Sequence, residues 1–176
     1  MNIRSYFNFV SRVRVLGATF VSALLLTIVL NTLPFGPEML DSRPGYTYQD
    51  ALTAIAGFGE EGRKEYMWAS MTLDTLLPAA YASFLAGIIY RLRPVENLWW
   101  LASLPVLAGG LDLCENFQIV TMLIQYPDIT ATQVAYASLF TELKGYAVLG
   151  CVTLAVLLSF VGLVRLIASR QHSQSP

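Results

Sequence analysis

Residues 98–126 read LWWLASLPVLAGGLDLCENFQIVTMLIQY, an apolar run that is long enough to cross a bilayer as a helix. Two carboxylates, Asp112 and Glu115, and the carboxamide of Asn116 interrupt this run. Their spacing of i, i+3 and i+4 places all three on one helix face. A charged side chain near the bilayer centre costs at least about 2.5–3.5 kcal/mol. We therefore expect this face to point into the protein and not toward lipid.

The composition of the whole chain indicates a membrane protein. Of 176 residues, 55% are hydrophobic and 13% are charged, whereas a soluble domain carries about 25% charged residues. A net charge of −1 gives no attraction to nucleic acid, which we do not expect as a partner. Cys114 and Cys151 lie in apolar segments and are expected to be buried thiols, without a disulfide. The single histidine, His172, makes no metal site alone, so we expect no metal and no cofactor.

The remaining apolar runs complete a predicted bundle of four spans, at about 15–33, 66–90, 98–126 and 134–166. The fourth run is longer than a bilayer requires and should tilt or protrude. Residues 1–14 form a basic, aromatic lead-in, and Gly57, Gly59 and Gly62 are expected to break or turn the chain. Residues 1–176 are thus expected to form one all-α membrane domain, an up-down four-helix bundle.

A short amphipathic helix is predicted in the long connection that follows the first span. Thr47 and Asp50 have the spacing of a capping box, and apolar residues then recur at helical intervals. We expect this surface helix at about 48–57, in the first outward loop.

Arginine and lysine in the connections predict the orientation of the bundle. They occur in residues 1–14, in the 91–97 turn and near the C-terminus, and they are absent from the 127–133 turn. Because cytoplasmic loops carry the excess of basic residues, we expect both termini in the cytoplasm.

On this topology, charges from three spans reach similar depths in the outer half of the bilayer. The second span contributes Asp74, the third Asp112 and Glu115, and the fourth Glu142 and Lys144. Intramembrane charges usually face the interior and pair with one another, so we expect one shared acidic pocket that is biased toward the outer side. The candidate ligand-binding residues are Arg63, Tyr66, Asp74, Tyr81, Asp112, Glu115, Asn116, Glu142 and Lys144.

Two further features constrain this pocket. Pro78 has no N–H, so the backbone carbonyl of Asp74 is expected to lack its helical partner. Lys144 lies two positions from Glu142, so it points elsewhere and should reach the third span or snorkel. Even with Arg63 added from the rim, two of the four acids have no cationic partner. Two explanations are open. Some of the acids carry a proton, or else the pocket holds a cation or a cationic ligand.

The motifs Gly59-x-x-Gly62-Arg63-x-x-Tyr66, Asp74-x-x-x-Pro78-x-x-Tyr81 and Asp112-x-x-Glu115-Asn116 resemble a group of uncharacterised bacterial integral membrane proteins with four predicted spans. The resemblance covers about residues 45–127 and implies the fold and a bacterial inner-membrane location, but no activity. In architecture the chain is also similar to the EXPERA membrane domain of sterol isomerases and sigma-2-type receptors. That domain has acids around an apolar cavity, whereas this chain has no histidine in its spans and no acid in its first span.

Three functions fit the sequence. The leading hypothesis is binding of a lipid-like or cationic small molecule, or of a cation, in the acidic pocket, with membrane lipids as partners. The second is acid–base chemistry on a lipid or isoprenoid, with Asp112 or Glu115 as the catalytic group and Lys144 or Arg63 holding an anion. The third is a proton-coupled carrier or a subunit of a membrane complex; a carrier of four spans is expected to form a homo-oligomer.

Overall fold

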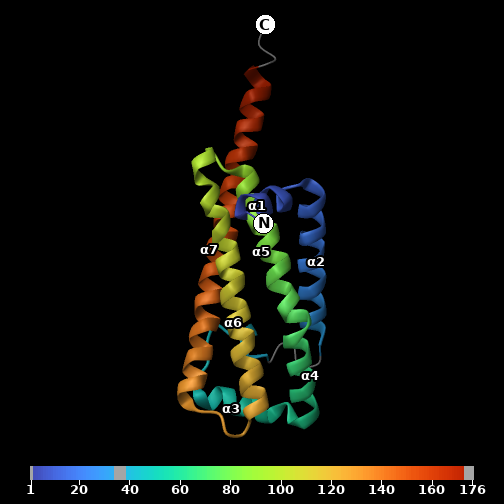
Figure 1. Cartoon of the computed structure of the whole chain (residues 1–176), viewed down its shortest axis with the longest axis vertical. Coiled ribbons are helices and arrows are strands. Elements are labelled where there is room, and N and C mark those ends of the chain that lie inside the picture. The colour runs from blue at the N-terminus through green and yellow to red at the C-terminus, as the bar shows by residue number, and fades with distance from the viewer. Residues whose placement is uncertain (1, 34–38, 173–176) are drawn as a thin grey trace.

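The computed structural model describes residues 2–33 and 39–172, in which it contains helices and no β-strand (Figure 1). The elements in order are α1 (Ile3–Val10), α2 (Val13–Thr32), η2 (Leu40–Ser42), α3 (Tyr48–Gly57), α4 (Gly59–Met71), α5 (Leu73–Leu92), η3 (Glu96–Ala102), α6 (Ser103–Gln125) and α7 (Ala131–His172). Four stretches are long and apolar enough to cross a membrane: Val13–Thr32, Gly59–Leu92, Glu96–Gln125 and Ala131–Ala168. They confirm the predicted all-α membrane bundle.

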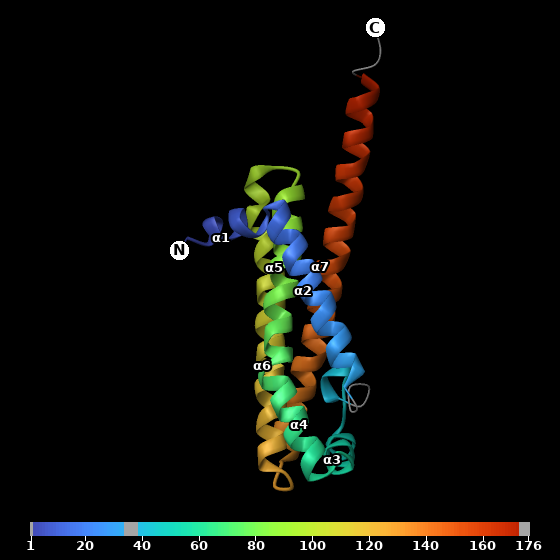
Figure 2. The ribbon, with the colours of Figure 1, turned by 90° about the vertical axis from the view of Figure 1, so that its right-hand side faces the viewer.

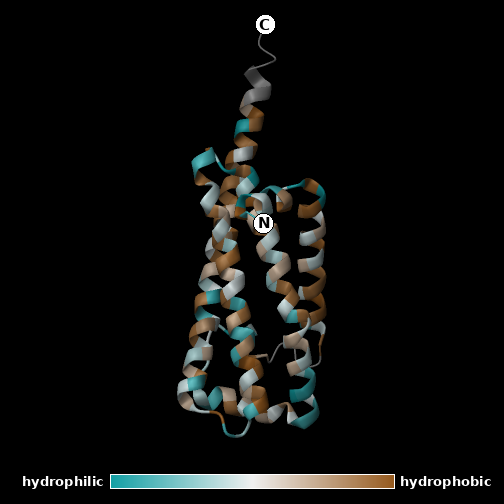
Figure 3. Cartoon of the chain, viewed as in Figure 1, coloured by the Kyte–Doolittle hydropathy of each residue, from teal (hydrophilic) through white to brown (hydrophobic). Residues whose placement is uncertain are grey.

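The spans run alternately up and down, and helix α5 packs against α2, α6 and α7 (Figure 1). The N-terminus, the η3 turn and the last part of α7 lie at one end, whereas α3 and the α6–α7 turn lie at the other. Helices α2 and α7 are hydrophobic along most of their length (Figure 3). They expose many large apolar side chains, among them Leu25, Leu149 and Phe160. Such surfaces are suited to lipid.

Helix α3 forms where the sequence predicts it and covers one end of the bundle (Figure 1). Its capping box is complete: Asp50 N–H donates to Thr47 Oγ1 at 3.2 Å, and Thr47 N–H donates to Asp50 Oδ2 at 2.9 Å. Its apolar face, with Ala51 and Ile55, is buried against the bundle.

The second span differs from the prediction because it begins seven residues earlier, at Gly59, and is broken in its middle. Gly59 turns the chain with φ +64°, whereas Gly62 lies inside α4, so the expected break there is wrong. Thr72, with φ −114° and ψ −81°, separates α4 from α5. Pro78 lies inside α5, buried near Gly109 of α6.

The N-terminal lead-in contains a helix that the sequence reasoning missed. Helix α1 starts at Asn2, whose side chain caps it, and turns at Ser11 and Arg12 into α2. Its Phe7 side chain is fully buried against α5 and Trp99. The spacing of Tyr6, Phe7 and Val10 is the signal that could have revealed it.

Two apolar clusters form the core, one at each end of the bundle, and polar groups lie between them. Along α6, Ala108 belongs to the cluster nearer α1, and Ile119 belongs to the cluster nearer α3. The residues between them on the buried face are Asp112, Glu115 and Asn116. Helix α7 exceeds the length predicted for its span, and its last turns project beyond the rest of the bundle (Figure 2).

Candidate ligand-binding site

Lys144 of α7 reaches across to α6 and does not snorkel, so the first of the two orientations expected for it is confirmed. Its Nζ lies 2.5 Å from Glu115 Oε2 and 3.6 Å from Asp112 Oδ1. Both carboxylates are buried, and Glu115 is 0% exposed. One lysine therefore compensates two acids of the same helix face.

Two neutral hydroxyl groups also donate hydrogen bonds to these carboxylates. Thr141, one helical turn before Lys144, donates to Glu115 Oε1 at 2.5 Å. Tyr81 of α5 donates to Asp112 Oδ2 at 2.8 Å. Hydrogen bonds to a charged group contribute more than those between neutral groups, so both hydroxyls help to offset the burial of the carboxylates.

The carbonyl of Asp74 that Pro78 leaves without a helical donor has acquired a side-chain partner. Asn116 Nδ2 donates to this oxygen at 2.9 Å. The kink in α5 and the carboxamide of α6 are therefore complementary, which explains why a buried helix carries Asn next to Glu115. The carbonyl is consequently not a free ligand for a cation.

Asp41 is the acid that sequence reasoning missed, because it comes from the connection after α2 and not from a span. Tyr66 of α4, fully buried, donates to Asp41 Oδ1 at 2.8 Å and accepts from Leu40 N–H at 3.0 Å. Asp41 and Asp74 line one and the same cavity. Nothing in the helical periodicity of the sequence could have placed this loop acid beside Asp74.

Two of the predicted ligand-binding residues take no part in this polar network, whereas Tyr66, Glu115 and Asn116 belong to it without lining the cavity that it encloses. Glu142 is exposed on the opposite side of α7 from Lys144 and packs beside Gly45. Two helix positions correspond to about 200°, so both side chains could not enter one pocket. Arg63 lies over the ring of Tyr126 at 4.7 Å, near the α3 end of the bundle. Asp41, and not Glu142, is therefore the acid that joins Asp74 and Asp112 in the shared pocket.

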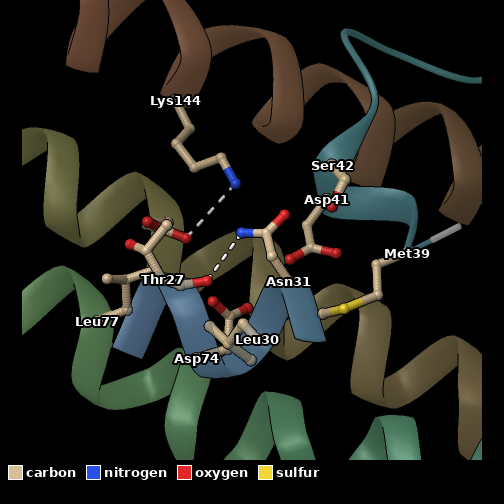
Figure 4. Close-up of a pocket in the computed structure, with 10 residues that line it drawn as sticks. Thr27, Leu30, Asn31, Met39, Asp41, Ser42, Asp74, Leu77 and Lys144 are labelled. Atoms are coloured by element: carbon tan, nitrogen blue, oxygen red, sulfur yellow. Dashed lines mark hydrogen bonds and ion pairs between the residues drawn. The ribbon is translucent and has the colours of Figure 1, made fainter. Parts of the chain in front are cut away.

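Three of the acids, Asp41, Asp74 and Asp112, surround with Lys144 a polar cavity of about 170 Å³ (Figure 4). Asp41, Asp74 and Lys144 point into it from the loop, from α5 and from α7. Helix α2 closes it with Thr27 and Asn31. The full lining is Thr27, Leu30, Asn31, Met39, Asp41, Ser42, Asp74, Leu77, Asp112 and Lys144.

An apolar groove of about 490 Å³ adjoins the cavity between α2, α5 and α7. Its walls carry aromatic and aliphatic side chains such as Phe20, Phe84 and Val148. The cavity and the groove share four lining residues, which are Thr27, Leu77, Asp112 and Lys144. Polar and apolar compartments thus meet at the Asp112–Lys144 ion pair.

The two carboxylates considered as catalytic groups differ in access. Asp112 lines both the cavity and the groove, whereas Glu115 lines neither and is held by Thr141 and Lys144. Only Asp112 could contact a bound molecule. Within the described part of the chain, no group of three or more His, Cys, Asp or Glu side chains is arranged to hold a metal ion.

The fold defines a multi-pass integral membrane protein with a layer of buried charge in its interior. No protein-family model matches the chain, and no curated protein and no solved structure matches it either. Inference about its function therefore starts from the geometry of the bundle.

Proposed function

We propose that the protein binds an amphiphilic, lipid-like molecule with a cationic head group. The head group lies in the polar cavity and the hydrocarbon part lies in the adjoining groove. The observation that carries the proposal is the junction of the two compartments at Asp112 and Lys144. An amphiphile has the same division between a polar and an apolar part.

The charge of the cavity wall favours a cationic head group. Asp41, Asp74 and Asp112 line it together with a single lysine, and Lys144 also serves Glu115. Asp74 Oδ2 accepts no hydrogen bond from residues 2–33 or 39–172, although Asp74 is only 4% exposed. Adjacent carboxyl groups such as Asp41 and Asp74 need a shared proton or a cation between them. A cationic head group satisfies both conditions.

The groove supplies both the apolar contacts and the route of entry. It is bounded by α2 and α7, the two spans whose surfaces are most exposed. A molecule already dissolved in the bilayer could therefore enter sideways, with its chain against Phe20 and Val152, and would not have to cross an aqueous opening. Its binding site would lie in a bacterial inner membrane, with the termini in the cytoplasm.

Thermal stability in the presence of matched amphiphiles tests this proposal. A ligand that binds only the folded protein raises the unfolding temperature according to its affinity. With the protein in a neutral detergent, we expect dodecyltrimethylammonium to raise the unfolding temperature more than dodecyl sulfate or dodecane. The Asp112→Asn and Asp41→Asn variants should lose this difference.

Glu142→Gln is the matched control, because it removes an acid from the exposed side of α7. It should keep the full response to the cationic amphiphile. Equal responses to cationic and anionic amphiphiles in the wild-type protein would contradict the proposal. A response lost equally in all three variants would indicate a nonspecific effect of net charge and would also contradict it.

Acid–base chemistry on a bound lipid or isoprenoid is the second candidate function, and one observation favours it. The groove leads to Asp112, whose Oδ2 accepts a hydrogen bond from the Tyr81 hydroxyl. A carboxyl group and a phenol at the end of an apolar groove can exchange a proton with a bound molecule. Incubation with membrane lipid extract and mass spectrometry should then show a product that the Asp112→Asn variant does not form. An unchanged lipid profile with the wild-type protein would exclude this chemistry for the lipids of that extract.

A further inference from the structure

A second groove, of about 360 Å³, lies on a different face of the bundle, between the α4–α5 break and α6. It is lined by Ser70, Met71, Thr75, Leu113, Asn116, Phe117 and Val120, none of which lines the acidic cavity or the groove beside it. Its rim residues Met71 and Phe117 are 53% and 72% exposed. The groove therefore opens toward lipid.

Two buried polar atoms in the lining of this groove have no partner in the part of the chain that the structure describes. They are Ser70 Oγ and Asn116 Oδ1, on side chains that are 1% and 3% exposed. An unsatisfied buried polar group costs about 1–3 kcal/mol, and inside a bilayer no bulk water is present to satisfy it. Two such groups in one groove point to a ligand that supplies the missing hydrogen bonds.

The remaining hydrogen bonds fix what that ligand must offer. Asn116 Nδ2 donates to the carbonyl of Asp74, so the orientation of the carboxamide is set and Oδ1 can only accept. The carbonyl of Ser70 already accepts from Thr75 Oγ1 at 2.8 Å, which leaves the Ser70 hydroxyl group itself. The groove therefore presents one unpartnered acceptor and one unpartnered hydroxyl that can donate or accept, and Thr75 Oγ1, which donates to the Ser70 carbonyl, can still accept.

We propose that this groove binds the hydroxyl group of a long-chain alcohol, with the hydrocarbon part lying along Leu113, Phe117 and Val120. A hydroxyl group can donate to Asn116 Oδ1 and accept from Ser70 Oγ, and the apolar lining fits a chain. A charged head group would find no counter-charge among the lining residues that the structure describes. This site is independent of the amphiphile proposed for the acidic cavity.

Photo-crosslinking in lipid nanodiscs separates the two sites. Three probes of equal chain length, each with a mid-chain diazirine, would carry a hydroxyl, a methyl or a trimethylammonium head group. Peptide mass spectrometry would map the labelled residues. We expect the alcohol probe to label α6 near Leu113 and Phe117, in excess of the methyl probe. The ammonium probe should label α2 and α7 near Phe20 and Val148, so failure of one proposal leaves the other testable.

Two variants test the alcohol site directly. Ser70→Ala removes one hydrogen-bond partner and should weaken competition by free hexadecanol about fivefold, the loss expected for one hydrogen bond. Leu113→Trp, at the exposed rim, should fill the groove and abolish specific labelling. Leu107→Trp is the control, because Leu107 is 65% exposed on the same helix and lines none of the grooves described above.

Equal labelling by the alcohol and methyl probes would show that the groove holds only acyl chains and would overturn the proposal. Competition unchanged by Ser70→Ala would overturn it as well, because the hydroxyl would then have no specific partner. Labelling that persists in Leu113→Trp would place the probe outside this groove and would have the same consequence.

Discussion

At the scale of single residues, the bond between Asn116 and the carbonyl of Asp74 makes a specific prediction about Pro78. Asn116→Ala should destabilise the protein by about 1–3 kcal/mol, because it leaves a buried carbonyl without a donor. In a Pro78→Ala background, the new backbone N–H can bond to Asp74 in the ordinary helical way. The same Asn116→Ala change should then cost less, by about 0.5–1.5 kcal/mol.

Thermal unfolding of the wild-type protein, the two single variants and the double variant in detergent measures this coupling. The loss of packing around the proline ring occurs in both Pro78→Ala proteins, so its contribution to the unfolding free energy cancels in the double-mutant cycle. A coupling energy of zero would show that the kinked helix satisfies the Asp74 carbonyl in another way.

Thr141 provides a second prediction at this scale. Its hydroxyl donates to Glu115, which is fully buried and shares Lys144 with Asp112. Thr141→Val keeps the volume and removes the donor, so we expect a loss of about 1–3 kcal/mol in unfolding free energy. Thr153→Val is the matched control on the exposed surface of α7, where the hydroxyl bonds only to the Leu149 carbonyl. Equal losses in the two variants would argue against a special role of Thr141.

Residue-level prediction from the sequence succeeded where one helix fixes the geometry. Asp112, Glu115 and Asn116 share a face because their spacing requires it, and Lys144 reaches that face from α7. The same rule separated Lys144 from Glu142, but the agreement of their depths kept Glu142 among the predicted pocket residues, and the structure places it on the exposed side of α7. Asp41 could not be predicted, because its place depends on how a loop packs against Tyr66.

At the scale of elements, the corner between α1 and α2 depends on Gly87. A Cβ atom there would lie 2.4 Å from the Val10 carbonyl oxygen and 2.7 Å from Leu16 Cδ2. Because backbone is the nearest obstacle, Gly87→Ala should push the corner away from α5 and cost about 1–3 kcal/mol. Gly110→Ala is the control, since no described atom lies within 4 Å of its added methyl. Thermal unfolding should show a loss for the first variant and none for the second.

The capping box of α3 makes stability depend on pH. The hydroxyl and then the backbone N–H of Thr47 lower the pKa of Asp50 below its usual value. A carboxyl group with a lowered pKa stabilises the fold above its unfolded value of about 3.9, and that contribution is lost as pH falls through its folded pKa. Between pH 6 and pH 3, the wild-type protein should therefore lose more stability than Asp50→Asn. Parallel pH profiles of unfolding temperature would contradict this.

Element boundaries followed from the sequence where composition changes sharply. The apolar run from Val15 and the capping box at Thr47 placed two helices to within two residues. The α4–α5 break could not be predicted, because no Pro or Gly stands at or next to Thr72 to mark it. Helix α1 was missed because eight residues carry too little periodicity to stand out from a basic leader.

At the scale of the whole molecule, two apolar clusters separate the polar layer from both ends of the bundle. Each end is covered by an additional helix, α1 on one side and α3 on the other (Figures 1 and 2). The charged layer is thus kept from bulk water, while a lateral groove connects it with the lipid side. This arrangement favours ligands that arrive from the bilayer over water-soluble ones.

The distribution of basic residues over the two ends predicts how the bundle is inserted. The α1 end carries Arg4, Arg12, Arg14, Arg91, Arg93 and Arg165, whereas the α3 end carries Arg43, Arg63 and Lys64. Three of the first group also lie over aromatic rings at this end: Arg4 over Trp99 at 4.7 Å, Arg12 over Phe9 at 5.6 Å and Arg93 over Tyr90 at 3.9 Å. Because cytoplasmic connections carry the excess of basic residues, we expect the α1 end inside.

Reporter fusions in bacteria test this orientation. A green fluorescent protein that follows Pro176 should fluoresce, because it folds in the cytoplasm, whereas alkaline phosphatase at the same position should stay inactive. Inserted in the α6–α7 turn after Asp128, the phosphatase should be active, because that turn carries no basic residue and lies at the opposite end. The reverse pattern would show that the bundle is inserted the other way round. Phosphatase activity at both positions would show that it inserts in both orientations. If the orientation holds, α3 and Asp41 lie toward the outer side, and the acidic cavity is nearer the external surface than the cytoplasm.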